Sequence, residues 1–544
     1  MTSPWQHEAV SAFRTNHPWL FYAAASATTS LVLLVSLFLF LVEYFKPVGK
    51  RRGINGKPPI LPPGPKGIPL LGNMLDMKEA VVDPYGKLFH DLKAHGEMAT
   101  LHLGSKTWIL LNSSRVCAEL IAKRGSATND RAPSPVISGI LSHGDRRSLL
   151  MSADKWAEPR RVYHSLLSGT ALRTYGAFQE LESVQLLAEY LINPEKWHRH
   201  HLRYANGVIV RIALGERIRK SSRELRDLQL VVGRFITSVG MSIVDWFPDL
   251  ARLPRFLQLG RGHWEGMDAW NYEVYSAWWA PARDKVLRGV APPSFVRDTL
   301  LNRETGYTGD DDDALYVAMQ LIEAGSDTTR EALNVMVMAA ITSPEPFARA
   351  RREIDAVCGS DGDARLPVME DMERLRYVCA LAKEVLRWRP LFLLTPDHTA
   401  TKDIEFEGYM FPAGVSFVIN EVAVATECEE PDKFEPERWM DGHEMDILHG
   451  SWAFGGGRRV CVGYRLAQRS LFITISRLVQ CFDFEANGPY DSRVLNPHTT
   501  EEPFPVKVTV RNQAYARLVG KEAVKAGVWE DAHGEEGSDE TVDS

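Results

Sequence analysis

The stretch that decides the fold reads FGGGRRVCVG, residues 454–463. Its three consecutive glycines permit a tight backbone path that can approach a flat ligand closely. Cys461 follows them and precedes a helical pattern through Leu466, Ala467 and Leu471. A helix N-terminus, nearby arginine charge and a metal ion all favour a thiolate at such a position. The stretch therefore predicts a metal-binding thiolate, and the alternative is a structural cysteine beside a glycine turn.

Residues 454–463 also fit FxxGxRxCxG, so this loop resembles the heme-ligand signature of the cytochrome P450 family. Further motifs stand in the order that this family requires. They are the WxxxR pair Trp156 and Arg160, the segment AGSDTT (324–329), the ExxR pair Glu384 and Arg387, and FEPERW (434–439), which contains Arg438. ExxR alone means little, because a Glu and an Arg three positions apart are common helix neighbours. An apolar N-terminal segment and a proline-rich hinge also fit this family, so the resemblance covers residues 20–515.

The resemblance implies heme b as cofactor, with Cys461 as the metal ligand and O2 as cosubstrate. The residues implied to contact the cofactor are Trp156, Arg160, His398, Phe454, Arg459, Cys461 and Gly463. On the side of the ring where dioxygen binds, Gly325 would leave room for it, and Asp327 with Thr328 would deliver protons as the catalytic pair. Glu384, Arg387 and Arg438 would form a structural triad that holds the heme-bearing core.

The composition is that of an ordinary globular protein, with 45% hydrophobic and 24% charged residues among 544. Apolar residues keep helical spacing from Leu181 to Leu191, and a long helix is predicted from Asp310–Asp313 to about Thr342. Short hairpins are predicted over 101–111 and 404–419. The expected fold is mainly α with small β-sheets, the cytochrome P450 fold, with the monooxygenase domain at 73–520 and one transmembrane helix before it.

The two ends of the chain carry their own predictions. Residues 20–42 contain no charged residue, and this segment is long enough to be a transmembrane anchor. The basic residues follow this segment, which places residues 1–19 in the lumen and the catalytic domain in the cytoplasm, at the endoplasmic reticulum. Residues 43–72 form a basic, proline-rich hinge, and residues 521–544 an acidic tail that we expect to be disordered.

The charge pattern and the missing motifs restrict the partners. The chain has a net charge of −7, and residues 530–544 contain seven acidic residues and no Lys or Arg. The remaining residues therefore carry no net charge, and this balance gives no sign of a basic surface that would bind nucleic acid. No nucleotide-binding motif is present. Electrons are therefore expected from an NADPH-dependent reductase, with cytochrome b5 as a possible second donor, docking on Lys155, Arg161, Arg465 and Arg469.

The resemblance implies a monooxygenase that inserts one oxygen atom into a small, lipophilic molecule, as a tailoring step of fungal secondary metabolism. The alternatives are a xenobiotic or aromatic-compound hydroxylase, an isomerase or dehydratase on the same fold, and a membrane-anchored heme carrier without catalysis. Candidate substrate-contacting segments are 133–150, 319–323, 391–395 and 499–504. The sequence departs from the family at 420–434, where relatives carry Trp-Ala and His-Asp-Pro and about three more residues.

Overall fold

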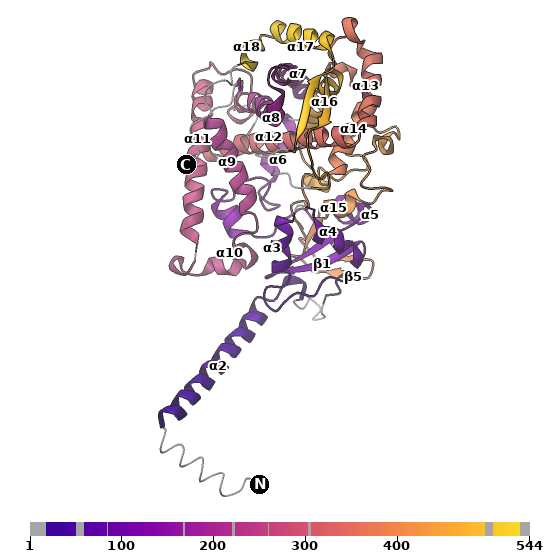
Figure 1. Cartoon of the computed structure of the whole chain (residues 1–544). Coiled ribbons are helices and arrows are strands. Elements are labelled where there is room, and N and C mark those ends of the chain that lie inside the picture. Colours follow the sequence, from indigo (N-terminus) through magenta and orange to yellow (C-terminus); the bar gives the residue numbers. More distant parts are fainter. Residues whose placement is uncertain are drawn as a thin grey trace.

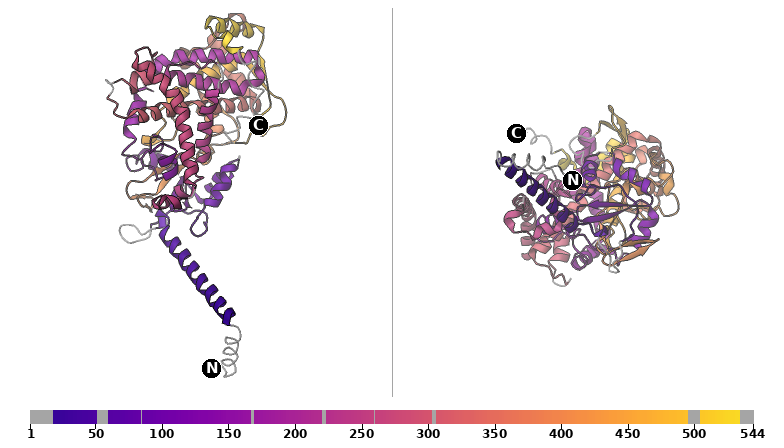
Figure 2. Two further views of the ribbon diagram at one scale, coloured as in Figure 1. Left: turned by 90° about the vertical axis from the view of Figure 1, so that its left-hand side faces the viewer. Right: turned by 90° about the horizontal axis from the view of Figure 1, so that it is seen from below.

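The computed structural model describes residues 18–50, 59–83, 85–166, 169–219, 223–258, 260–302, 306–494 and 504–533. A helical body carries a small sheet at one end, and helix α2 (Pro18–Tyr44) projects from that end (Figures 1 and 2). The larger helices of the body are α6 (Ala157–Leu166), α7 (Gly169–Ile192), α8 (Trp197–Leu214), α9 (Arg223–Ser238), α11 (Arg261–Leu287), α12 (Asp311–Thr342), α13 (Pro344–Cys358), α14 (Arg376–Trp388), α16 (Tyr464–Cys481) and α17 (Gln513–Lys525). The shorter helices are α3 (Met74–Val82), α4 (Lys87–Asp91), α5 (Ser114–Cys117), α10 (Ile243–Trp246), α15 (Glu421–Ala425) and α18 (Trp529–Ala532).

Helix α12 crosses the middle of the body and packs against α8, α11, α14 and α16 (Figure 1). Its start follows from the acidic run before it. The Asp310 side chain accepts the backbone N–H of Asp313, and the Asp313 side chain accepts the backbone N–H of Asp310. This reciprocal cap satisfies two amide groups that a helix start otherwise leaves without partners, and the carboxylates suit the positive end of the helix dipole. The long helix predicted between Asp310 and Thr342 is confirmed.

The main sheet has the strand order β1 (Met98–Leu103), β2 (Lys106–Leu111), β6 (Ser416–Ile419), β3 (His398–Thr399). Its first two strands form the predicted hairpin, in which Gly104 takes a φ of +59°. Alternating side chains fill two cores, with Ile109 on one face and Leu110 on the other. Strands β4 (Ile404–Phe406) and β5 (Tyr409–Phe411) make a separate hairpin, and β7 (Phe482–Ala486) pairs with β8 (Val506–Val510).

The predicted hairpin over 404–419 is only half right. The turn at Gly408 joins β4 to β5, but the turn at Pro412–Gly414 leads into β6, which pairs in parallel with β2 and antiparallel with β3. A parallel partner more than 300 residues away by register (Ile109 with Phe417) leaves no local pattern in the sequence.

The predicted transmembrane segment 20–42 is not confirmed. Among the residues that the structure describes, no helix is both long and apolar enough to cross a membrane. The lumenal prediction for 1–19 falls mostly on residues outside the described ranges, as does the hinge between 51 and 58. The rest of the proline-rich hinge lies along the sheet, because Thr100 donates its amide N–H to the Pro63 carbonyl and its hydroxyl to the Pro62 carbonyl.

The prediction of a disordered tail from residue 521 is wrong as far as residue 533. Helices α17 and α18 pack against α7, and Tyr515, Val519 and Ala523 of α17 are fully buried at helical spacing. Asp531 accepts a hydrogen bond of 2.6 Å from Arg217. The acidic composition concealed this apolar face, since composition averages over a periodicity that only position reveals. Residues 534–544 lie outside the described ranges.

Candidate active site

The cysteine loop is shaped by its glycines. Gly455 and Gly457 have φ angles of +67° and +62°. A Cβ on Gly457 would lie 2.3 Å from the Ile121 carbonyl oxygen, so no other residue fits there. The Cys461 amide donates to the Phe454 carbonyl at 2.9 Å, which closes the loop and presents Cys461 just before α16, whose N-cap is Gly463.

The Cys461 thiol is reachable by solvent although protein atoms surround it. Burial raises the pKa of this thiol, and backbone N–H groups of Gly463 and Tyr464, together with the charge of Arg160, act in the opposite direction. These N–H groups belong to the start of α16, where a helix stabilises negative charge. The sulfur is thus placed to become an anionic ligand once a metal compensates its desolvation.

Two arginines converge beside this loop. The Arg459 guanidinium lies 4.4 Å above the Trp156 ring and that of Arg160 lies 5.8 Å from it. Arg459 donates to the carbonyls of Asn129 and Met151, and Arg160 donates to the Val460 carbonyl at 2.6 Å. Within the described part of the chain, neither arginine has a carboxylate at ion-pair distance. Burial lowers the pKa of Arg459 to about 9, with the charge of Arg131 as a second cause.

This arrangement fits the heme that the sequence implies. A heme propionate is a carboxylate, the group that two arginines without acidic partners require. Trp156, Arg160 and Arg459 are brought together as predicted, and the solvent-accessible sulfur of Cys461 is on the same loop as Arg459. His398 on β3 is buried, and its Nδ1 lies 3.1 Å from the Thr128 carbonyl. Burial lowers the pKa of His398 to about 3, so this ring is neutral.

The AGSDTT segment occupies the middle of α12. Ala324 is exposed there although most of the helix is buried, so accessible space lies beside this point. The Thr328 hydroxyl donates to the Ala324 carbonyl at 2.7 Å, and Asp327 lies 3.4 Å from Arg330. A Cβ on Gly325 would lie 2.6 Å from Cγ1 of Ile209 on α8. Gly325 therefore permits close packing of the two helices, and the prediction that it leaves room for dioxygen is wrong.

A polar network that the motifs do not include extends Asp327 into the body. Arg330 donates to Glu331 at 2.8 Å, Asn334 donates to Glu331, and the Asn334 side-chain oxygen lies 2.8 Å from Nδ1 of His201 on α8. Burial raises the pKa of Glu331 to about 7, Arg330 lowers it, and Asp327 raises it further. The sequence signal is a row of polar residues at positions 327, 330, 331 and 334, which keep helical spacing on α12.

The structure brings the three predicted triad residues together at Glu384 of α14. Its carboxylate, fully buried, accepts hydrogen bonds from Arg387 (two, at 2.8 Å), Arg438 (3.2 Å), the Trp439 indole and the Glu435 amide (2.8 Å each). Arg387 also donates to three carbonyls of the segment 425–433. This segment, where the sequence departs from the family, contains the end of α15.

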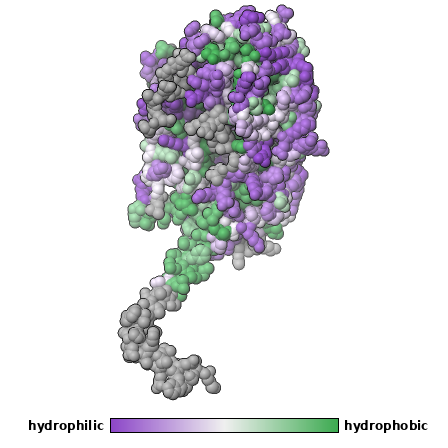
Figure 3. Space-filling model, viewed as in Figure 1, coloured by the Kyte–Doolittle hydropathy of each residue, from purple (hydrophilic) through white to green (hydrophobic). Residues whose placement is uncertain are grey.

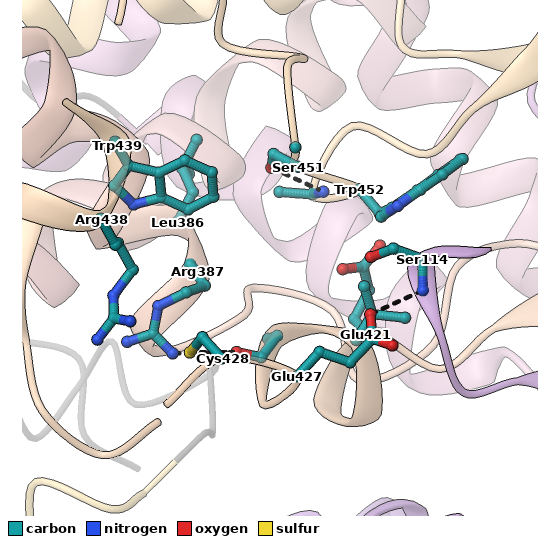
Figure 4. A pocket seen from close by; sticks show the side chains of 14 residues that line it. Ser114, Leu386, Arg387, Glu421, Glu427, Cys428, Arg438, Trp439, Ser451 and Trp452 are labelled. Carbon is teal, nitrogen blue, oxygen red and sulfur yellow. Dashed lines mark hydrogen bonds between the residues drawn. The ribbon is translucent and has the colours of Figure 1, made fainter. Parts of the chain in front are cut away.

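A cavity of about 240 Å³ adjoins this triad (Figure 4). Arg387, Arg438 and Cys428 lie on one side of it, and Glu421 with Glu427 on the other. Burial raises the pKa of Glu421 to about 8. None of the residues predicted to contact the heme lines this cavity, so it is separate from the cysteine site.

Two of the predicted substrate segments meet at α12. Ser148, in the loop 133–150, donates its amide to the Gln320 side chain at 2.7 Å. Arg147 of the same loop forms a buried ion pair with Glu323 and donates to the Tyr275 hydroxyl at 2.6 Å. By contrast Leu393 and Leu394 pack into the core beneath the sheet. Of the segment 499–504, only Phe504 lies in the described ranges.

Comparison with known proteins identifies the class. The cytochrome P450 family model matches residues 62–503, so the chain belongs to the cytochrome P450 family. The cytochrome P450 monooxygenase verL of Clonostachys rogersoniana is 33% identical, covering 84% of this chain and 88% of its own length. The cytochrome P450 monooxygenase fogE of Aspergillus ruber is 30% identical, covering 90% and 94%. A zebrafish cytochrome P450 solved with progesterone superimposes with a TM-score of 0.64 at 23% identity, covering 79% of this chain and 100% of that one.

The protein is a monooxygenase of this family, with heme ligated by a thiolate and O2 as cosubstrate. The fold is the cytochrome P450 fold, mostly helical with small sheets. When bound, the heme supplies the iron that activates dioxygen, and the thiolate ligand increases electron density on that iron. Cys461 is the residue of this chain that fits the ligand position, and Arg160 and Arg459 fit the propionates.

Proposed function

We propose that this monooxygenase inserts one oxygen atom into a small, lipophilic molecule in a tailoring step of fungal secondary metabolism. The observation that carries the chemistry is the accessible Cys461 thiol beside two arginines that lack acidic partners. The fungal origin of the relatives supports the metabolic setting. Met319, Leu321 and Ile322 of the predicted substrate segment on α12 are apolar and buried, which supports a substrate of low polarity.

In this proposal the chain positions reactants and moves protons. Trp156, Arg160 and Arg459 hold the propionates, and Phe454 at the start of the cysteine loop packs against the helical core. Asp327 and Thr328 bring protons to the side of the ring where dioxygen binds, because both lie next to exposed Ala324 on α12. General acid catalysis of this kind contributes about 10²–10⁴-fold to a rate.

The first experiment is a dithionite-reduced, carbon-monoxide difference spectrum of the heme-loaded full chain and of Cys461→Ala. The strongly red-shifted Soret band of a thiolate ligand is expected in the unchanged protein and absent from the variant. A band that persists in Cys461→Ala overturns the ligand assignment. Product formed from heavy dioxygen should then carry one labelled atom, whereas unlabelled product would point to the isomerase or dehydratase alternative.

We also propose that electrons come from an NADPH-dependent reductase that docks near the start of α16. Arg465 is exposed and stacks on Tyr464, whereas Lys155 and Arg161 are paired with Asp145 and Glu158, and Arg469 is half-buried against Gly176. Arg465 is therefore the residue of the predicted basic face that is most available to an acidic partner. Arg465→Glu should slow reductase-driven reduction severalfold and leave reduction by dithionite unchanged; equal rates with reductase would contradict this docking site.

We further propose attachment to the endoplasmic reticulum membrane with the catalytic body in the cytoplasm. Exposed apolar residues cover α2 from Leu31 to Phe40 (Figure 3). Helix α10 lies at the same end of the body (Figure 1), and the exposed residues Met241 and Phe256 flank it in the sequence. Phe45 at the end of α2 packs against Phe247, which joins the two regions. Deletion of residues 1–44 should shift the protein from the microsomal pellet to the supernatant. Carbonate extraction of the full chain then separates an integral anchor from surface attachment.

A further inference from the structure

A second cluster with metal-ligating chemistry lies between the triad and the cysteine loop. Asp441, His443 and His449 each offer a ligand atom, and these three atoms lie within 4.8 Å of one another. Nδ1 of His443 is 3.6 Å from one carboxylate oxygen of Asp441, and Nε2 of His449 is 3.4 Å from the other. The two imidazole rings are stacked, with their centroids 3.9 Å apart.

The loop that carries these residues is held in place by the body. The Lys383 ammonium on α14 donates to the carbonyls of Asp446 and His449 at 2.9 Å and to that of His443 at 3.4 Å. The Asp441 carboxylate accepts the His443 amide at 2.9 Å. Because both histidine backbones are tied to one lysine, their rings are held close together before any ion binds, which lowers the entropy cost of binding.

We propose that Asp441, His443 and His449 bind a zinc ion, separate from the heme iron. Two imidazoles and one carboxylate, with a water molecule completing a tetrahedron, are a ligand set that zinc uses in proteins. Zinc–ligand bonds of about 2.0–2.2 Å require ligand atoms roughly 3.3 Å apart. The three ligand atoms lie within 4.8 Å of one another on exposed side chains, so side-chain rotations bring them to that separation. All three side chains are partly exposed, which leaves access for the ion and the fourth ligand.

The local charge also favours a cation. Three carboxylates, those of Asp441, Glu444 and Asp446, face two positive charges, the Lys383 ammonium and the Arg376 guanidinium, which lies 3.8 Å from Glu444. The surplus of negative charge attracts a divalent ion, whereas the two imidazoles select zinc over magnesium, which prefers oxygen ligands. The bound zinc would brace the segment between Arg438 of the triad and the cysteine loop at 454–463.

The test uses the untagged, heme-loaded full chain, freed of other metals with a chelator. Equilibrium dialysis against micromolar zinc chloride is followed by measurement of zinc and iron in the same sample. One zinc per heme iron is expected, with an excess of magnesium chloride having no effect. His449→Ala and Asp441→Asn should each weaken binding at least tenfold, and zinc should raise the midpoint of thermal unfolding of the unchanged protein but not of these variants.

His90→Ala is the matched control, since His90 is an exposed histidine on α4, away from the cluster. It should bind zinc as the unchanged protein does. The carbon-monoxide difference spectrum of each variant reports whether the fold around the heme is intact. Absence of zinc at one per iron, or binding that both cluster variants retain, overturns the proposal.

Discussion

Two buried carboxylates in this molecule, those of Glu384 and Glu331, differ in the number of hydrogen-bond donors around them. Glu384 on α14 accepts five hydrogen bonds, from two arginines, an indole and a backbone amide. Glu331 on α12 is nearly as buried, but among the described residues it accepts hydrogen bonds only from Arg330 and Asn334. A buried carboxylate with many donors is tied to its surroundings by hydrogen bonds, whereas burial with few donors raises the pKa of Glu331 so that it exchanges protons at accessible pH. The first arrangement holds the structure together, and the second is able to move protons.

The largest effect is expected where the donors are most numerous. Glu384→Gln places an amide NH2 against groups that all donate, and leaves the Arg387 charge buried without its partner. Breaking a buried pair in this way costs about 3–5 kcal/mol of unfolding free energy. Urea unfolding of the heme-loaded protein measures this cost, and heme loss should accompany it. Glu429→Gln, an exposed change on the neighbouring segment, should leave the unfolding curve unchanged. A loss below 1 kcal/mol for Glu384→Gln would contradict the structural role.

The second-largest effect is expected at Asp327, which we propose to deliver protons. Asp327→Asn keeps the shape of the side chain but removes its acid–base function beside Thr328. Product formation should fall about 100-fold, at the lower end of the range for general acid catalysis, while NADPH oxidation continues and releases peroxide. The carbon-monoxide spectrum should be unchanged, and Asp311→Asn at the start of the same helix should have no effect on coupling. Coupled turnover at the normal rate would rule out Asp327 as the proton donor.

The features that the sequence predicts correctly are those formed by residues close together in the chain. The cysteine loop, the start of α12 and the motif containing Glu384 are contiguous patterns whose physical reasons lie within a few residues. The Glu331 network was missed because its partner His201 lies 133 residues from Asn334 along the chain, on α8. Gly325 was misread for the same reason, since the atom that its missing Cβ would meet belongs to Ile209.

At the C-terminal end, the prediction from composition is wrong because the segment has a partner surface. The acidic composition of the tail predicts disorder, yet Ala523, Val528 and Ala532 are buried there and Asp531 pairs with Arg217. Composition describes how a segment behaves without partners, and here α7 supplies the partner surface. The pairing of β6 with β2 was likewise invisible, because parallel strands from distant segments leave no turn signal between them.

Titration of Glu331 gives a third test of the comparison. Its pKa in the folded protein is raised to about 7 from an ordinary value of 4.5. The folded state therefore binds the proton more tightly than the unfolded state, so unfolding free energy falls as pH rises from below 4.5 through 7. Between pH 5 and 8 this one group should remove about 2 kcal/mol. Urea unfolding of Glu331→Gln across this range should lack that component of the pH dependence.

The groups that face Glu331 define the control for this titration. Arg330, Asp327 and Asn334 lie on its own helix, and through Arg330 and Asn334 the network reaches His201 and His198 on α8. Burial lowers the pKa of His201 to about 3 and that of His198 to about 4, so neither histidine titrates between pH 5 and 8. His198→Gln should therefore keep the pH dependence of the unchanged protein. If Glu331→Gln also keeps it, Glu331 does not titrate and the two carboxylates differ less than the geometry indicates.

The smallest effect separates the members of the triad. Arg438 reaches Glu384 through a single 3.2 Å bond and uses its other nitrogens on the carbonyls of Glu429 and Lys433, at 3.2 and 3.4 Å. Arg438→Lys keeps a positive charge but loses this fork of donors. Because Arg387 and Trp439 still satisfy the carboxylate, unfolding free energy should fall by only about 1 kcal/mol. A loss equal to that of Glu384→Gln would mean that the donors act as one cooperative unit, so that counting them would no longer explain why Glu384 and Glu331 behave differently.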